Sequence, residues 1–75
     1  MSYNGWKNWE TWNVVLWIGN DEGLYSLARE CKSYSRFCES LKEIGGEIAF
    51  QTPDGVAWND SGLDKEAITE YFTEL

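Results

Sequence analysis

Glutamates spaced by four residues are the side chains of this sequence whose types and spacing best fit a chemical role. Glu66, Glu70 and Glu74 form one series near the C-terminus, and Glu39 and Glu43 form a second. On a helix, a spacing of four places the carboxylates along one face with about 6 Å of rise between them. That repeat is similar to the phosphate repeat of a nucleic-acid strand, so two such rows could imitate a duplex towards a protein that binds DNA. We call these five residues the acidic rows.

The alternative interpretation of the acidic rows is a solvated helix face. An amphipathic helix with one apolar stripe leaves polar positions at the same spacing, and glutamate is a common residue there. One observation favours a role beyond solubility. Glu70 and Glu74 lie near the negative end of the expected helix dipole, repel each other and have no lysine four residues away, which costs each a few tenths of a kcal/mol. Both interpretations stay open.

Tryptophan supplies the second candidate binding chemistry. Four of the five tryptophans fall within the first 17 residues, where a platform for stacking bases or sugars is conceivable. Such platforms lie in basic grooves, and Lys7 is the one basic residue in that stretch. We therefore expect the tryptophans to pack in the core, with an exposed edge of Trp6 or Trp58 as an interface anchor. The candidate partner-binding residues are Glu39, Glu43, Glu66, Glu70, Glu74 and Trp58.

Several enzyme and metal chemistries lack the residues that they need. The chain has no histidine, which excludes Ser/His and Cys/His catalytic couples and imidazole metal ligands. Segment 54–60 places acids near a glycine but lacks the alternating oxygen ligands and terminal glutamate of a calcium loop. A domain this small rarely encloses a dry pocket in which paired carboxylates could act as acid and base. The sequence thus predicts a protein that is not an enzyme and binds no cofactor and no metal.

The cellular compartment is predicted from the cysteines and the apolar runs. Cys31 and Cys38 are seven residues apart, about 10 Å of rise on one helix and beyond the reach of a disulfide. The start of the chain lacks the basic region and apolar stretch of a secretion signal. The longest apolar run, residues 14–18, has five residues, whereas a membrane span needs about 18. We expect reduced thiols and a cytoplasmic location.

The net charge of −7 is confined to one half of the chain. Residues 1–38 hold four acidic and four basic side chains, whereas residues 39–75 hold nine acidic and two basic ones. An acidic surface repels phosphate backbones and anionic lipids, so we expect no direct contact with nucleic acid or membrane. The pattern predicts an aromatic hub in the first half and an acidic coat in the second.

Helices must position the acidic rows, and the apolar pattern predicts a compact, mainly α-helical bundle of three or four helices. A chain this short is a single domain, residues 1–75. Asn8 is a suitable N-cap for a helix over residues 9–18, whose seven apolar residues predict a central position surrounded by the others. A buried strand is the alternative there. Asn13 is predicted to be a buried residue whose hydrogen bonds fix neighbouring backbone.

The rest of the chain leaves two structural alternatives open. An apolar stripe over residues 24–44 predicts either one helix or two that meet near Lys32 and Ser33. We favour the break because Ser33 and Ser35 are poor residues for the middle of a helix, and Ser33 can cap a second one. Residues 48–58 contain the only proline, in a Thr-Pro-Asp-Gly turn, and predict either a short β-hairpin or a packed loop. Asp64 is the expected N-cap of a last helix.

Three short motifs carry a family resemblance. They are Tyr-x-Gly at residues 3–5, Thr-Trp-x-Val-x-Leu-Trp-Ile at residues 11–18 and Thr-Pro-Asp-Gly-Val-x-Trp at residues 52–58. With these motifs the chain resembles a group of small, uncharacterised proteins encoded by tailed bacteriophages, most closely over residues 3–28. The resemblance implies no fold and no catalytic or binding residues. It implies a phage accessory protein that acts inside an infected bacterium.

Two functions of different classes follow from these patterns. The first is a non-enzymatic phage accessory protein that binds a host or phage protein through its acidic C-terminal half, for instance by nucleic-acid mimicry. The alternative is a self-associating structural or assembly module, in which exposed aromatic surface forms a homodimer and the acids serve only solubility. The oligomeric state distinguishes the two.

Overall fold

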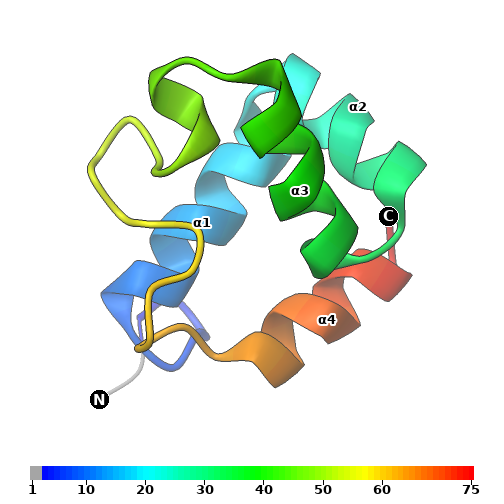
Figure 1. The fold of residues 1–75 in the computed structure, drawn as a ribbon. Coiled ribbons are helices and arrows are strands. Elements are labelled where there is room, and N and C mark those ends of the chain that lie inside the picture. The colour runs from blue at the N-terminus through cyan, green and yellow to red at the C-terminus, as the bar shows by residue number, and fades with distance from the viewer. Residues whose placement is uncertain (1–2) are drawn as a thin grey trace.

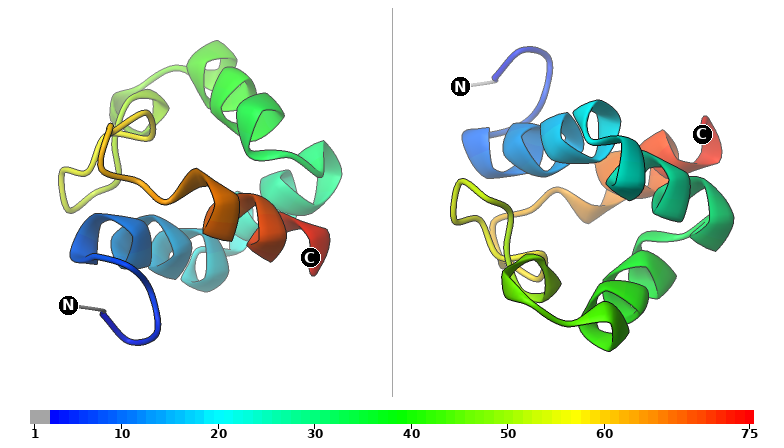
Figure 2. Two further views of the ribbon diagram at one scale, coloured as in Figure 1. Left: turned by 90° about the horizontal axis from the view of Figure 1, so that it is seen from below. Right: turned by 90° about the horizontal axis from the view of Figure 1, so that it is seen from above.

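The computed structural model describes residues 3–75, which form four α-helices and one short 3₁₀-helix. The elements are α1 (Trp9–Asn20), α2 (Glu22–Cys31), α3 (Tyr34–Ile44), η1 (Glu47–Ala49) and α4 (Lys65–Thr73). Helices α1 and α3 lie on opposite sides of the molecule, and the loop of residues 50–64 runs between them towards α4 (Figures 1 and 2). The predicted mainly helical, compact fold is confirmed.

Side-chain caps set the ends of α1 and the start of α2. Asn8 Oδ1 accepts a hydrogen bond from the Thr11 backbone N–H at 2.9 Å and so begins α1, as predicted. Asp21 ends α1 and at once begins α2, because its Oδ1 accepts the Leu24 N–H at 3.0 Å. These caps occupy N–H groups that have no partner within the helix. The helix predicted for residues 9–18 is confirmed, and the alternative of a buried strand is not adopted.

The predicted central position of α1 is wrong. One face of the helix is buried, with Val14 and Ile18 fully inaccessible, but Trp9 is 38% exposed and Trp12 and Trp17 are half-buried. The helix therefore forms one side of the molecule, as both views of Figure 2 show. Apolar residues cover the whole helical wheel, but the three tryptophans of α1 occupy its partly exposed faces, where large aromatic side chains are tolerated.

The stripe over residues 24–44 divides into two helices, as favoured. Lys32 has a left-handed backbone with φ of +61°, which ends α2. Ser33 then caps α3, since its Oγ accepts the Arg36 N–H at 3.3 Å. The change of chain direction at Lys32 and Ser33 allows α2 and α3 to pack against each other.

Residues 48–58 form a packed loop, so the hairpin alternative is not adopted. Its two sides meet at an isolated antiparallel bridge between Gln51 and Ala57. The predicted turn is present, because the Gly55 N–H donates to the Thr52 carbonyl at 2.8 Å. The residues before the turn form η1 rather than the first strand of a hairpin.

The buried aromatic cluster is centred on Phe37 and joins rings from both halves of the chain, whereas the tryptophans of the first 17 residues lie outside it, which corrects the predicted aromatic hub. The rings of Trp58 and Phe72 meet that of Phe37 edge to face at 5.5 and 5.7 Å between centroids. Trp58 is only 2% exposed, and its Nε1–H donates to the Ile48 carbonyl at 2.6 Å. The Tyr34 hydroxyl in turn donates to the Trp58 carbonyl at 2.6 Å.

The prediction of Trp58 as an exposed interface anchor is therefore wrong. An indole can be buried completely when its N–H has a hydrogen-bond partner, and the backbone at Ile48 supplies one. Trp58 belongs to the core.

Candidate functional site

The acidic rows are exposed, but they lie at separate places. Glu39 and Glu43 on α3 line a hollow that opens towards α2. Glu70 and Glu74 line a different hollow, between α4 and the N-terminal segment. Glu66 is exposed on α4 and lines neither hollow. The two hollows share no residue, so each row faces its own surroundings.

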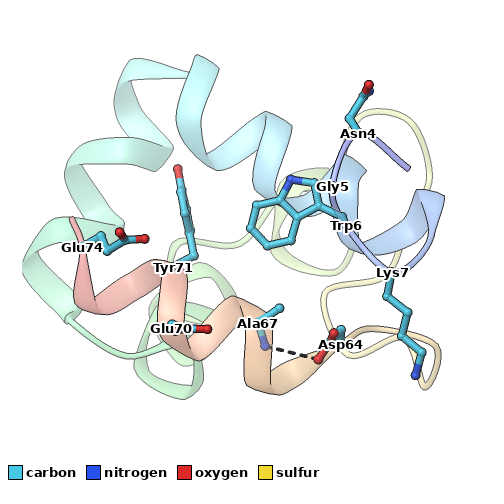
Figure 3. A pocket seen from close by; sticks show the side chains of 9 residues that line it. All are labelled: Asn4, Gly5, Trp6, Lys7, Asp64, Ala67, Glu70, Tyr71 and Glu74. Atoms are coloured by element: carbon cyan, nitrogen blue, oxygen red, sulfur yellow. Dashed lines mark hydrogen bonds between the residues drawn. The ribbon is translucent and has the colours of Figure 1, made fainter. Parts of the chain in front are cut away.

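The hollow at α4 brings carboxylates and aromatic rings together. It has a volume of about 430 Å³, and Figure 3 shows the rings of Trp6 and Tyr71 next to each other in its lining. We call it the α4 hollow and define it by its side chains Trp6, Lys7, Asp64, Glu70, Tyr71 and Glu74.

A tight turn at the start of the chain positions Trp6. Asn4 and Gly5 both have positive φ angles, +48° and +89°, and Tyr3 and Trp6 exchange backbone hydrogen bonds around them. Positive φ at both central positions is typical of the type I′ turn, for which Asn-Gly is the preferred sequence. The ring of Tyr3 packs on Trp12 at 4.8 Å between centroids and thereby holds the turn against α1. The Asn-Gly pair signalled this turn, which our sequence reasoning missed.

Tyr71 lies beside Trp6 in the lining of the α4 hollow. Its ring meets that of Trp6 edge to face, with 6.1 Å between centroids and 85° between planes. Burial raises the pKa of the Tyr71 hydroxyl above its ordinary value, with a smaller contribution from Tyr25. Tyr71 therefore remains a neutral phenol at physiological pH.

Hydrogen bonds from the start of α1 fix the start of α4. Asn8 Nδ2 donates to the Gly62 carbonyl at 2.6 Å, and the Asp64 N–H donates to Thr11 Oγ1 at 3.0 Å. Asp64 caps α4 as predicted, since its Oδ1 accepts the Ala67 N–H at 3.2 Å (Figure 3). The helix that carries Glu70 is thereby held in place relative to α1.

The electrostatics of the α4 hollow favour a cation. Three carboxylates line it, and the one ammonium group, that of Lys7, points away from Tyr71 and Glu74 at the far end (Figure 3). Aromatic rings attract a cation as well. The lining side chains described by the structure include no serine, threonine or cysteine that could act as a nucleophile. The arrangement suits recognition of a positively charged group.

A second polar cluster joins two of the motifs noted in the sequence. Asn13 is 1% exposed, and its Nδ2 donates to Asp54 Oδ2 at 2.8 Å. Trp17 Nε1 donates to the same oxygen at 2.9 Å, while Thr52 Oγ1 donates to Asn13 Oδ1 at 2.7 Å. The hydrogen bonds from Asn13 and Trp17 lower the pKa of Asp54. Asn13 is buried and hydrogen-bonded as predicted, but its partners are the side chains of Asp54 and Thr52 rather than neighbouring backbone. We call Asn13, Trp17, Thr52 and Asp54 the Asn13 cluster.

The other residues considered for chemistry, Asp60 and the two cysteines, have roles or surroundings that the fold explains. The carboxylate of Asp60 accepts the Gly62 N–H at 2.7 Å within the loop. Cys31 and Cys38 are both free thiols, and burial raises the pKa of Cys38. Within residues 3–75, no three side chains of metal-ligating type come together. In the same part of the chain, no helix has the length and apolar character that crossing a membrane requires.

Comparison with known proteins gives this chain a family. The model of DUF7249, described as a family of unknown function, matches residues 1–75. The chain belongs to this family. The expectation of an uncharacterised family is therefore confirmed. No curated protein and no solved structure matches the chain. Membership in DUF7249 transfers no catalytic or binding residue, so the function has to be inferred from the geometry of the site.

Proposed function

We propose that this member of DUF7249 is a non-enzymatic accessory protein of a tailed bacteriophage that binds a host or phage protein. The proposed partner presents a lysine or arginine side chain to the α4 hollow. One observation carries this proposal: the side chains of Glu70 and Glu74 lie exposed in the same hollow as the edge-to-face pair of Trp6 and Tyr71.

The two kinds of lining match the two parts of a basic side chain. Lysine and arginine have an apolar stem and a cationic head, and they bury the stem against apolar surface. Here Trp6 and Tyr71 offer aromatic surface for the stem, and Glu70 and Glu74 offer acceptors for the head. Hydrogen bonds between charged partners are stronger than neutral ones. A bound cation also relieves the repulsion between the two glutamates.

The wider charge distribution supports a basic partner. Residues 39–75 contain all of the net charge of −7, and a field of one sign accelerates the approach of a partner of opposite charge. Proteins that bind nucleic acid present such basic surfaces. Occupation of a nucleic-acid-binding surface by this chain is therefore one form that the proposed activity takes.

The test is affinity capture of partners from the bacterial host with the tagged protein, quantified by mass spectrometry. The variant Glu70→Gln/Glu74→Gln removes two of the three carboxylates of the α4 hollow, and Glu39→Gln/Glu43→Gln removes the same charge elsewhere. We expect a partner that the wild type and the second variant retain and the first variant loses. Equal loss from both variants, or retention by the first, would show that the α4 hollow is not the binding site.

Self-association is the second candidate function, and exposed apolar side chains favour it. Ile44 is 67% exposed and Phe50 is 68% exposed. Two such residues supply apolar surface that a second copy could cover. Size-exclusion chromatography with light scattering at low and high salt tests this function. A salt-insensitive dimer supports an assembly module, whereas a monodisperse monomer excludes it.

A further inference from the structure

A second, apolar hollow shares no residue with the α4 hollow and is larger. Its volume is about 540 Å³, and α1, α2, α3, η1 and the proline loop all contribute to its lining. We call it the α2–α3 hollow. Its apolar side chains are Trp17, Leu24, Leu27, Leu41, Ile44 and Ile48, together with Pro53.

The lining is graded from buried to open. Leu24 and Leu41 are 7% and 1% exposed, whereas Leu27 and Ile48 are half-buried and Ile44 is 67% exposed. A volume between about 300 and 1,000 Å³ with a mainly apolar lining is typical of binding pockets. The hollow therefore has room for apolar side chains, with Ile44 standing at its edge.

The charged side chains of this hollow have one sign. Asp21 and Glu30 lie among its lining residues, and none of the lining residues that the structure describes is a lysine or arginine. One oxygen of Asp21 caps α2 by accepting the Leu24 N–H. The other oxygen of Asp21 and both oxygens of the exposed Glu30 can accept hydrogen bonds from a partner's cations.

We infer that the α2–α3 hollow is a docking site, distinct from the α4 hollow, for a basic amphipathic helix of a partner protein. The apolar side chains of that helix enter between Leu27, Ile44 and Ile48, and its flanking lysines or arginines pair with Asp21 and Glu30. Insertion of an amphipathic helix into an apolar groove is a recurring mode of recognition. Asp21 and Glu30, which we call the acidic rim, favour a basic helix over an acidic one.

The same charges argue against a second copy of this chain as the occupant. Each copy carries a net charge of −7, and a second copy would bring that charge to an acidic rim. Like charges brought together at an interface oppose binding.

The test uses a synthetic helical peptide of leucine and lysine, with leucines at positions i and i+4, titrated into the ¹⁵N-labelled protein. We expect chemical-shift changes at the amides of Gly23 and Ser26 and at the indole of Trp17, which line the hollow. Two control peptides separate the contributions. One replaces leucine with serine, the other replaces lysine with glutamate, and each should bind at least about tenfold more weakly.

Two surface variants form a matched pair for the same titration. Ile44→Ser removes an apolar side chain at the edge of the hollow, and Phe50→Ser removes an equally exposed one outside it. Because both residues are mainly exposed, both variants should fold. We expect Ile44→Ser to weaken peptide binding about tenfold or more and Phe50→Ser to change it less than about twofold.

Three results would overturn this inference. The first is equal binding of the peptide to the two variants. The second is a set of shifts centred on Trp6 and Tyr71 and abolished by Glu70→Gln/Glu74→Gln, which would place the basic peptide in the α4 hollow instead. The third is a dimer of the free protein that Ile44→Ser dissociates, which would make a second copy the occupant.

Discussion

Replacement of Asn13 by alanine tests whether the Asn13 cluster ties the loop of residues 50–64 to α1. The side chain is 1% exposed and accepts a hydrogen bond from Thr52 Oγ1 at 2.7 Å. Thr52 is itself 1% exposed, and its Oγ1 also accepts the Val56 N–H at 3.1 Å. Alanine at position 13 therefore leaves a buried hydroxyl without an acceptor in the turn that Thr52 begins.

The expected cost follows from the burial of that hydroxyl. A buried polar group that loses its partner destabilises a protein by about 1–3 kcal/mol, and removal of the Asn13 side chain also leaves a small cavity. We expect Asn13→Ala to lower the free energy of unfolding by about 2 kcal/mol. A chain of this length has a total of about 4–11 kcal/mol, so the variant should still fold.

Urea unfolding followed by tryptophan fluorescence measures the change, with Asn20→Ala as the control. Asn20 lies on the same helix but is exposed, and its side-chain Nδ2 donates to the Leu16 carbonyl on that helix. That control should cost no more than about 0.5 kcal/mol. A double-mutant cycle of Asn13→Ala with Thr52→Val should give a coupling energy of about 1 kcal/mol. Equal costs for Asn13→Ala and Asn20→Ala, or an additive cycle, would show that the cluster does not hold the loop.

Three further predictions concern the acid stability, the core and the N-terminal turn. The hydrogen bonds from α1 lower the pKa of Asp54, so its stabilising effect is present above about pH 4 and is lost as the pH falls further. Asp54→Asn should then reduce stability at pH 7 and flatten the acid side of a pH series of urea midpoints. Trp58→Ala should lower the free energy of unfolding by about 3–5 kcal/mol because it leaves a large cavity in the core. Trp9→Ala, at a residue 38% exposed, should shift the urea midpoint far less. Gly5→Ala should cost about 1 kcal/mol at its φ of +89°, and it should shift the Trp6 indole resonance in a ¹⁵N spectrum.

Helix boundaries could be predicted because capping is a local interaction. Asn8, Ser33 and Asp64 each bond a backbone N–H three residues further along, so the sequence around each cap contains the whole signal. The break between α2 and α3 followed from the same reasoning.

The position of Trp58 could not be predicted, because its burial depends on distant partners. Ile48 and Tyr34, which bond its indole and its carbonyl, lie ten and 24 residues away. Hydropathy and spacing do not report such contacts. The central position expected for α1 failed for a related reason, since an apolar helix can cover its own flanks with partly exposed indole rings.

The candidate site was predicted in part. The spacing of Glu70 and Glu74 marked them as one exposed row, but nothing in the spacing placed Trp6 beside Tyr71, 65 residues later in the chain. The separation of the two acidic rows also depends on how α3 and α4 pack. The turn at Asn4 and Gly5 could have been predicted from the sequence, since the Asn-Gly dipeptide is a strong signal for a tight turn.

The binding of a basic side chain in the α4 hollow can be measured directly by NMR titration of the ¹⁵N-labelled protein with a capped Gly-Arg-Gly peptide. We expect saturable shift changes centred on the Trp6 indole and the Glu70 and Tyr71 amides. Glu39→Gln/Glu43→Gln should preserve these changes, and Glu70→Gln/Glu74→Gln should abolish them. Shifts spread evenly over the acidic surface, or identical titrations for the two double variants, would mean that the α4 hollow recognises no basic side chain.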